Sequence, residues 1–261
     1  MKQFHFVLVH GACHGAWCWY KVVTLLTAAG HRATAVDLGG CGVNPRTLAE
    51  IRTLDDYVHP LMDFMGSIDS HYHHHQDDDD DDDDHNDKKV ILVGHSFGGI
   101  AMSFAMQKFP QKILAAVFSF RRTPVEEYMD TRFWYDNGPE NAPTSVLLGP
   151  QILAGKFFQN CQPEDIELGK MLVRPQGVFS EDLAKEGLFT EDKYGAVERV
   201  YVKCEEDEQM KLDFQEWIIE RSPPQQPRMN VKSIPKADHM VMLSKPLELT
   251  LCLLEIAHQY D

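Results

Sequence analysis

Short apolar segments alternate with longer segments of helical periodicity along most of the chain. The apolar runs have the length of strands that are buried on both faces of a parallel sheet. This pattern predicts strands over residues 4–9, 32–38, 90–93, 113–118, 200–204 and 229–234. Apolar spacing between them predicts helices over residues 19–29, 53–65, 100–108, 213–220 and 246–260, although Pro60 interrupts the second. The alternation indicates an α/β protein with a mostly parallel sheet between helical layers.

The alternation stops once, between about residues 124 and 190, where acidic and proline-bearing pieces resemble short helices. We interpret residues 121–190 as a shortened helical cap inserted into a single domain of residues 1–261. An insertion at this point covers the carboxyl ends of the strands. Open α/β sheets place their functional sites at those ends.

Residues 67–88 differ in composition from the rest, because eight consecutive aspartates lie between histidines. Such a segment buries nothing and its like charges repel, so we expect a disordered surface loop. Histidine and carboxylate are both metal ligands, but a flexible run defines no ligand geometry. We therefore predict no metal site and no cofactor.

Charge and cysteine content limit the class of partner. The formal net charge is −15, yet ten acidic residues fall within residues 67–87, and the rest carries 30 acidic and 25 basic residues. An acidic chain does not suit nucleic acid. No apolar run approaches the roughly 18 residues of a membrane helix, and the six cysteines form no CxxC pair. We expect a soluble, cytoplasmic protein with free thiols that acts on a small molecule. A homodimer is the one assembly that we consider.

Ser96 lies in the run Gly94-His95-Ser96-Phe97-Gly98, directly after a predicted strand. The Gly-x-Ser-x-Gly pattern alone arises often by chance. Here a strand leads into it and a helix-compatible run follows, which is the context of a nucleophile elbow. We predict Ser96 as a nucleophile; the alternative is a glycine-rich turn that only joins a strand to a helix.

A serine hydroxyl needs a base to take its proton. In folds with this elbow the acid and then the base follow the serine along the chain. After Ser96 only His239 and His258 remain. His258 lies within the last predicted helix, whereas His239 follows a strand in a loop at the sheet edge. We therefore predict His239 as the base.

The acid is expected in a loop after a strand between the serine and the base. The strand over residues 200–204 ends in Glu205-Glu206-Asp207-Glu208, and position alone does not choose among these four acids. Asp238 is a rival by proximity to His239, although adjacent residues on an extended chain point opposite ways. The acid would fix the imidazole tautomer and stabilise the imidazolium.

Stabilisation of an oxyanion requires two backbone N–H groups. One comes from the residue after the nucleophile and the other from the loop after the first strand. These are predicted to be the N–H groups of Phe97 and of Ala12, in the His10-Gly11-Ala12 loop. An ordinary turn at the strand end is the alternative for this loop.

Several stretches match one known family: Phe6 to Trp17, Val36-Asp37-Leu38, Gly94 to Gly99, Ala237-Asp238-His239-Met240, and in the cap Leu147 to Pro150 and Leu172 to Pro175. On these stretches the chain resembles the plant methylesterases, a group with salicylate and jasmonate methyl esterases, polyneuridine aldehyde esterase and the related hydroxynitrile lyases. The resemblance covers nearly the whole chain. It implies an α/β-hydrolase fold and a triad of Ser96, His239 and, by the match at Cys204-Glu205-Glu206-Asp207, Asp207.

The lyases of this group have a Lys directly after the catalytic His and a Thr directly after the first-strand His. The Lys supplies the positive charge that handles cyanide. Met240 and Gly11 occupy those positions here. The resemblance therefore implies an esterase rather than a hydroxynitrile lyase.

Three departures from the group concern the loops. They are the insertion at residues 67–88, a shortened stretch at residues 117–124 and a longer linker at residues 223–227. The shortened stretch normally helps to line the acyl pocket. Its loss is expected to widen the pocket, change the substrate or disable the enzyme.

The expected function is that of a serine carboxylesterase. Its substrate would be a small methyl ester, either a plant hormone ester or an alkaloid ester whose freed acid then loses carbon dioxide. The alternative is a hydrolase-like protein that only binds a small ligand, which the altered cap favours and the intact triad opposes. We assign the substrate pocket to His95, Tyr128, Val146, Leu148 and Phe158.

Overall fold

The computed structural model describes residues 2–68, 89–119, 129–221 and 229–260. Its centre is a six-stranded sheet in which all neighbouring strands are parallel, in the order β2-β1-β3-β4-β8-β9. The strands are β1 (His5–Val9), β2 (Arg32–Val36), β3 (Val90–His95), β4 (Ile113–Ser119), β8 (Arg199–Cys204) and β9 (Asn230–Ile234). The predicted parallel α/β architecture is confirmed.

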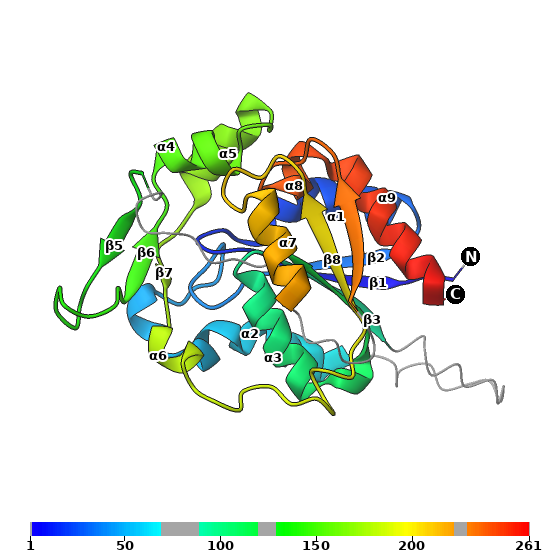
Figure 1. Cartoon of the computed structure of the whole chain (residues 1–261), viewed down its shortest axis with the longest axis horizontal. Helices are drawn as coiled ribbons and strands as arrows, with labels where there is room; N and C mark the ends of the chain where they lie inside the picture. The colour runs from blue at the N-terminus through cyan, green and yellow to red at the C-terminus, as the bar shows by residue number, and fades with distance from the viewer. Residues whose placement is uncertain (1, 69–88, 120–128, 222–228, 261) are drawn as a thin grey trace.

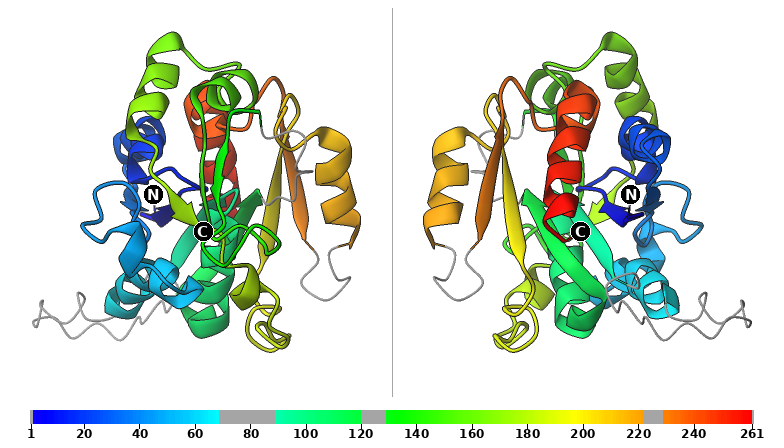
Figure 2. Two further views of the ribbon diagram at one scale, coloured as in Figure 1. Left: turned by 90° about the vertical axis from the view of Figure 1, so that its left-hand side faces the viewer. Right: turned by 90° about the vertical axis from the view of Figure 1, so that its right-hand side faces the viewer.

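Helices cover both faces of this sheet (Figures 1 and 2). Strand β1 shows the reason, because Phe6 and Leu8 point into one hydrophobic cluster and Val7 and Val9 into the other. Alternate side chains of a strand face opposite ways, so a strand between two helical layers must be apolar throughout. All five residues of β1 are buried.

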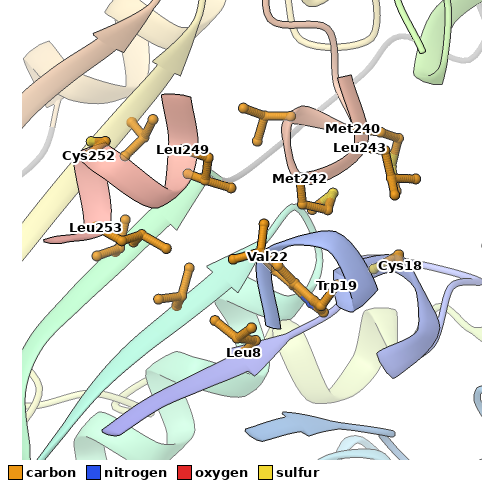
Figure 3. Packing of buried hydrophobic residues seen from close by; sticks show 14 of the residues in the cluster. Leu8, Cys18, Trp19, Val22, Met240, Met242, Leu243, Leu249, Cys252 and Leu253 are labelled. Atoms are coloured by element: carbon orange, nitrogen blue, oxygen red, sulfur yellow. The ribbon is translucent and has the colours of Figure 1, made fainter. Parts of the chain in front are cut away.

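The two helical layers have different members. The first contains α1 (Tyr20–Ala28), the short α8 (Val241–Ser244) and α9 (Pro246–Ala257), whose packing around Trp19 and Leu8 is seen in Figure 3. The second contains α2 (Leu54–Ser67) and α3 (Gly98–Lys108), and α7 (Leu212–Arg221) adds partly buried isoleucines to it. Both layers support the turns at the carboxyl ends of the strands, where the site lies.

Helix α2 contains Pro60 and still runs to Ser67. Its start is strongly specified, because Thr53 Oγ1 accepts the N–H of Asp56 and the Asp56 carboxylate accepts the N–H of Thr53. This reciprocal cap and the buried apolar face outweigh the one backbone bond lost at proline. The acidic tract that follows, from residue 69 to 88, lies outside the described residues.

The cap differs from the expected set of short helices. It contains a three-stranded antiparallel sheet of β5 (Arg132–Trp134), β6 (Ser145–Leu147) and β7 (Gln176–Gly177). Strands of two or three residues are too short to show alternation in a sequence. The helical part is α4 (Pro150–Ile152), a π-helical turn (Leu153–Phe157), α5 (Pro163–Leu172) and α6 (Ser180–Leu183).

Among the described residues, no helix has both the length and the apolar character needed to cross a membrane. All six cysteines are free thiols, as the sequence predicts. Five are buried, and Cys161 is partly exposed.

Helix α9 offers a matched test of the core. Leu253 is fully buried, whereas Leu251 of the same helix is 53% exposed. We expect Leu253→Ala to lower the free energy of unfolding by about 2–5 kcal/mol, and Leu251→Ala to change it by less than about 0.5 kcal/mol. Urea unfolding of the two variants measures this, and equal losses would contradict the assigned packing.

Candidate active site

The turn between β3 and α3 holds Ser96 in a left-handed backbone conformation, with φ of +50°. Such a φ is costly for a residue with a side chain and is found where a structure enforces it. Gly98 shows the enforcement, because a Cβ there would lie 2.4 Å from the carbonyl oxygen of His10 and 2.7 Å from that of Val9. Only glycine allows the elbow to sit this close to the end of β1. Ser96 itself is 5% exposed.

The structure brings His239 together with one acid. Its Nδ1 lies 2.8 Å from Oδ2 of Asp207, and both side chains are buried. The second oxygen of Asp207 accepts the N–H groups of Gln209 and Met210, at 2.8 and 2.6 Å. These two bonds fix the carboxylate, which in turn fixes the imidazole ring.

Among the four consecutive acids after β8, burial separates Asp207 from the rest. Asp207 is 4% exposed, whereas Glu205, Glu206 and Glu208 are exposed. A carboxylate at Nδ1 requires that this nitrogen carries the proton, so Nε2 carries the lone pair. Nε2 is buried and has no hydrogen-bond partner within the described parts of the chain. Such a nitrogen can accept a proton from a nearby hydroxyl.

His95, the residue before the serine, contacts the backbone of His239 through its side chain. Its Nε2–H donates to the carbonyl oxygen of His239 at 2.8 Å, and the two ring centroids are 4.7 Å apart. On the other side, the Phe157 ring meets His239 edge-on at 4.6 Å. Burial holds the pKa of His95 well below its usual range, so the ring stays neutral. His95 thus connects the turn at Ser96 directly to the loop that contains His239.

The loop after β1 lies against the elbow. A Cβ on Gly11 would be 2.8 Å from His95 Nδ1 and 3.0 Å from Ser96 Cβ, so the approach requires glycine. His10 orients the next peptide: its Nε2 accepts the N–H of Leu38 at 3.1 Å, which leaves Nδ1–H to donate to the Gly11 carbonyl at 2.8 Å. Because a peptide group is planar, fixing this carbonyl also fixes the direction of the Ala12 N–H. The sequence singled out this loop but not the orienting role of His10.

The cap holds the same loop from the other side. Cys13 has a φ of +64°, its N–H donates to Gln176 Oε1 at 3.0 Å, and its carbonyl accepts the N–H of Arg174 at 2.9 Å. His14 donates from Nδ1 to the Ala12 carbonyl at 2.7 Å and stacks on Trp17, Phe157 and Phe158. The contacts with Phe157, Phe158, Arg174 and Gln176 join residues more than 140 positions apart, which no local pattern reveals.

The residues assigned to the substrate pocket lie in different surroundings. Phe158 is fully buried against His14, Leu148 is buried in the core cluster, and Val146 is partly buried with its carbonyl at Cys13 Sγ. His95 lies against His239 as described, and Tyr128 is outside the described residues. None of the other four is among the residues that line a cavity of about 390 Å³ between α3, β8 and α7.

The described residues contain no group of three or more His, Cys, Asp or Glu side chains that could hold a metal ion. The arrangement around Ser96 combines a serine at positive φ, a buried Asp207–His239 pair and a peptide group at Gly11–Ala12 whose direction is fixed. Together with the parallel sheet and the elbow, it defines the class of the α/β hydrolases with a serine at the turn.

Comparison with known proteins agrees with this class. Residues 6–250 match the profile of the alpha/beta hydrolase family, and the chain belongs to that family. It is 45% identical to salicylic acid-binding protein 2 of Nicotiana tabacum, over 98% of each protein. It is 43% identical to methyl jasmonate esterase 1 of Vitis vinifera, over all of this chain and 99% of the relative.

A crystal structure of polyneuridine aldehyde esterase superposes on the chain with a TM-score of 0.83 and 44% identity, covering 98% of this chain and 99% of that one. The resemblance inferred from the sequence is thereby confirmed. The chain is a member of the plant methylesterase and polyneuridine aldehyde esterase branch, and by this membership it is classed with the carboxylic ester hydrolases.

The buried histidines predict how acid affects stability. Burial lowers the pKa of His14 from 6.5 to about 3. Between these two pH values the unfolded chain binds a proton at His14 and the folded protein does not. Stability is therefore complete above pH 6.5 and falls as the pH drops toward 3, by about 1.4 kcal/mol per pH unit for each such histidine. We expect His14→Gln to show a shallower fall between pH 6 and 4.5 in urea unfolding.

The matched control for this measurement is His59→Gln on α2, where the side chain is 57% exposed. The free energy of unfolding of this variant should change with pH as it does in the wild type. An unchanged slope in His14→Gln would show that His14 does not resist protonation in the fold.

Proposed function

We propose that the protein is a serine carboxylesterase that hydrolyses the methyl ester of a small carboxylic acid. The observation that carries the proposal is the buried Asp207–His239 pair, which the ring of His95 contacts directly before the strained Ser96. Nε2 of His239 has no hydrogen-bond partner among the described residues. The substrate class follows the names of relatives such as methyl jasmonate esterase 1 and polyneuridine aldehyde esterase. A hormone ester and an alkaloid ester are the two substrate types we consider.

The proposed reaction begins when Ser96 Oγ attacks the ester carbonyl and its proton passes to His239 Nε2. The N–H groups of Ala12 and Phe97 hold the oxyanion, and Asp207 stabilises the imidazolium. Collapse of the tetrahedral intermediate expels methoxide, which takes the proton from His239 and leaves as methanol. Water, deprotonated by His239, then cleaves the acyl-enzyme and releases the acid and Ser96. An acid with a carbonyl at its β position would afterwards lose carbon dioxide.

A hydroxynitrile lyase is disfavoured by the surroundings of the base. Met240 is fully buried directly after His239, and its N–H donates to the Phe157 carbonyl at 3.2 Å. The lysine that supplies a positive charge in the lyases therefore has no counterpart at this position. Gly11 likewise has no room for a side chain beside Ser96.

A small-ligand-binding protein is the second candidate, and the name of the relative salicylic acid-binding protein 2 favours it. The two candidates differ in turnover. A binder retains the ligand or ester, whereas an esterase releases methanol and acid. We also propose a reducing, cytoplasmic location, because the six cysteines are free thiols.

The first test is a screen of methyl esters with wild type and Ser96→Ala. The panel contains methyl salicylate, methyl jasmonate, methyl indole acetate and alkaloid methyl carboxylates. The aryl ester p-nitrophenyl acetate is added as a generic substrate. We expect turnover of at least one ester and a loss of at least about 10⁴-fold in Ser96→Ala, because the nucleophile is gone. Chromatography of the released acid measures the rate.

Ser103→Ala is the matched control, since Ser103 is a buried serine of α3 whose hydroxyl donates to the Gly99 carbonyl. It should keep the wild-type rate. Equal hydrolysis by wild type and Ser96→Ala would refute the nucleophile. Tight binding of an ester without release of acid would favour the binding protein instead.

The second test concerns the acid. Asp207→Asn keeps the shape of the side chain but favours the wrong imidazole tautomer, so kcat should fall by about 10⁴-fold. Glu208→Gln, the exposed neighbour, should leave kcat unaltered. A smaller loss of kcat in Asp207→Asn than in Glu208→Gln would contradict the assignment of Asp207 as the acid.

A further inference from the structure

The loop of the base, residues 237–240, is attached to its surroundings at every position. The Ala237 carbonyl accepts the N–H of Glu206 at 2.9 Å, and the His239 carbonyl accepts from His95 at 2.8 Å. The Met240 N–H donates to the Phe157 carbonyl at 3.2 Å. Two side chains attach the loop as well, that of His239 to Asp207 and that of Asp238 to the cap.

Asp238 is fully buried next to His239, and one oxygen of its carboxylate faces the cap. Its Oδ2 accepts the backbone N–H of Asn160 at 2.9 Å and the thiol of Cys161 at 3.3 Å. The hydroxyl of Ser244 in α8 also interacts with this carboxylate. Burial raises the pKa of this carboxyl. His239 Nδ1 meets Asp207 instead, so Asp238 is left for another task than that of the catalytic acid.

The cap turn, defined here as residues 157–161, also contacts the loop of the acid. Gln159 Nε2 donates to the Glu206 carbonyl at 2.6 Å, and Asn160 Nδ2 donates to the Glu206 carboxylate at 2.9 Å. Glu206 directly precedes Asp207. The cap turn therefore bridges the two loops that carry the acid and the base, and Asp238 is its side-chain attachment on the side of the base.

We propose that Asp238 is a positioning residue for His239, because its carboxylate fastens the loop of the base to the backbone of the cap turn. The proposal rests on the proposed esterase function for its kinetic test. The distance from His239 Nε2 to Ser96 Oγ depends on the path of residues 237–240. Loss of the Asp238 attachment frees one side of that path, and displacements of about 1 Å in a catalytic group cost up to about 100-fold in rate.

Three variants separate anchoring from charge and from general loosening of the cap. Asp238→Ala removes the acceptor, whereas Asp238→Asn keeps an oxygen for the Asn160 N–H and removes the charge. Asp165→Ala is the matched control, because Asp165 is also buried and also fastens the cap to the core, through Tyr20 and Lys21 of α1 at 2.9 and 2.5 Å. Asp165 has no hydrogen bond to residues 237–240 among the described contacts.

We expect Asp238→Ala to lower kcat about 10- to 100-fold with KM within about threefold of wild type. Asp238→Asn should restore most of kcat, and Asp165→Ala should retain the wild-type kcat. If Asp238→Ala does not fold, as judged by circular dichroism, Asp238→Ser takes its place, since its hydroxyl is too short to reach Asn160. Wild-type kcat in the Ala or Ser variant, or an Asn variant as slow as either, would overturn the proposal.

A second measurement needs no ester. Proton NMR of the free protein reports the Nδ1–H of His239 in its bond to Asp207, at low field. This resonance should shift or broaden in Asp238→Ala and stay in place in Asp238→Asn and Asp165→Ala. An unchanged resonance in Asp238→Ala would contradict positioning. An inactive wild type with the expected NMR changes would refute the esterase and leave the positioning role intact.

Discussion

The close contact between the end of β1 and the turn after β3 is the constraint on which the site depends. Side chains at Gly11 or Gly98 would overlap with His95 or with the carbonyl oxygens of Val9 and His10. The contact requires the parallel register in which Val9 lies opposite Gly94. It also forces Ser96 into positive φ, where its backbone energy is unfavourable. The two helical layers supply the packing that maintains this arrangement.

Buried histidines give this contact a defined set of hydrogen-bond donors and acceptors. His10 uses both ring nitrogens, one to accept the Leu38 N–H and the other to donate to the Gly11 carbonyl. His239 places Nδ1 on Asp207, and its Nε2 has no hydrogen-bond partner among the described residues. His95 uses one nitrogen to hold the backbone of His239. Burial keeps the pKa values of His10 and His95 low, so their donor and acceptor atoms stay assigned at neutral pH. Because these pKa values are low in the folded state, the stability of the fold decreases at acidic pH.

The cap contributes to the site as well as covering it. One part of it, at Arg174 and Gln176, binds the backbone of Cys13 in the loop after β1. Another part, the cap turn at residues 157–161, binds the loops next to Asp207 and His239. A change in the cap therefore reaches both the N–H at Ala12 and the acid–base pair.

The sequence by itself determined the parallel α/β architecture, and it predicted the elbow around Ser96 and His239 as the base. These follow from periodicity, from glycine spacing and from chain order, which are local or one-dimensional properties. Residue spacing left four adjacent acids open, and the family resemblance pointed to Asp207. The tertiary structure distinguishes Asp207 from the other three by its burial and by the N–H groups of Gln209 and Met210. It also turned Asp238 toward the cap and built a cap sheet from strands too short to leave a pattern. Those outcomes depend on contacts between residues far apart in the chain, and such contacts leave no periodic trace in the sequence.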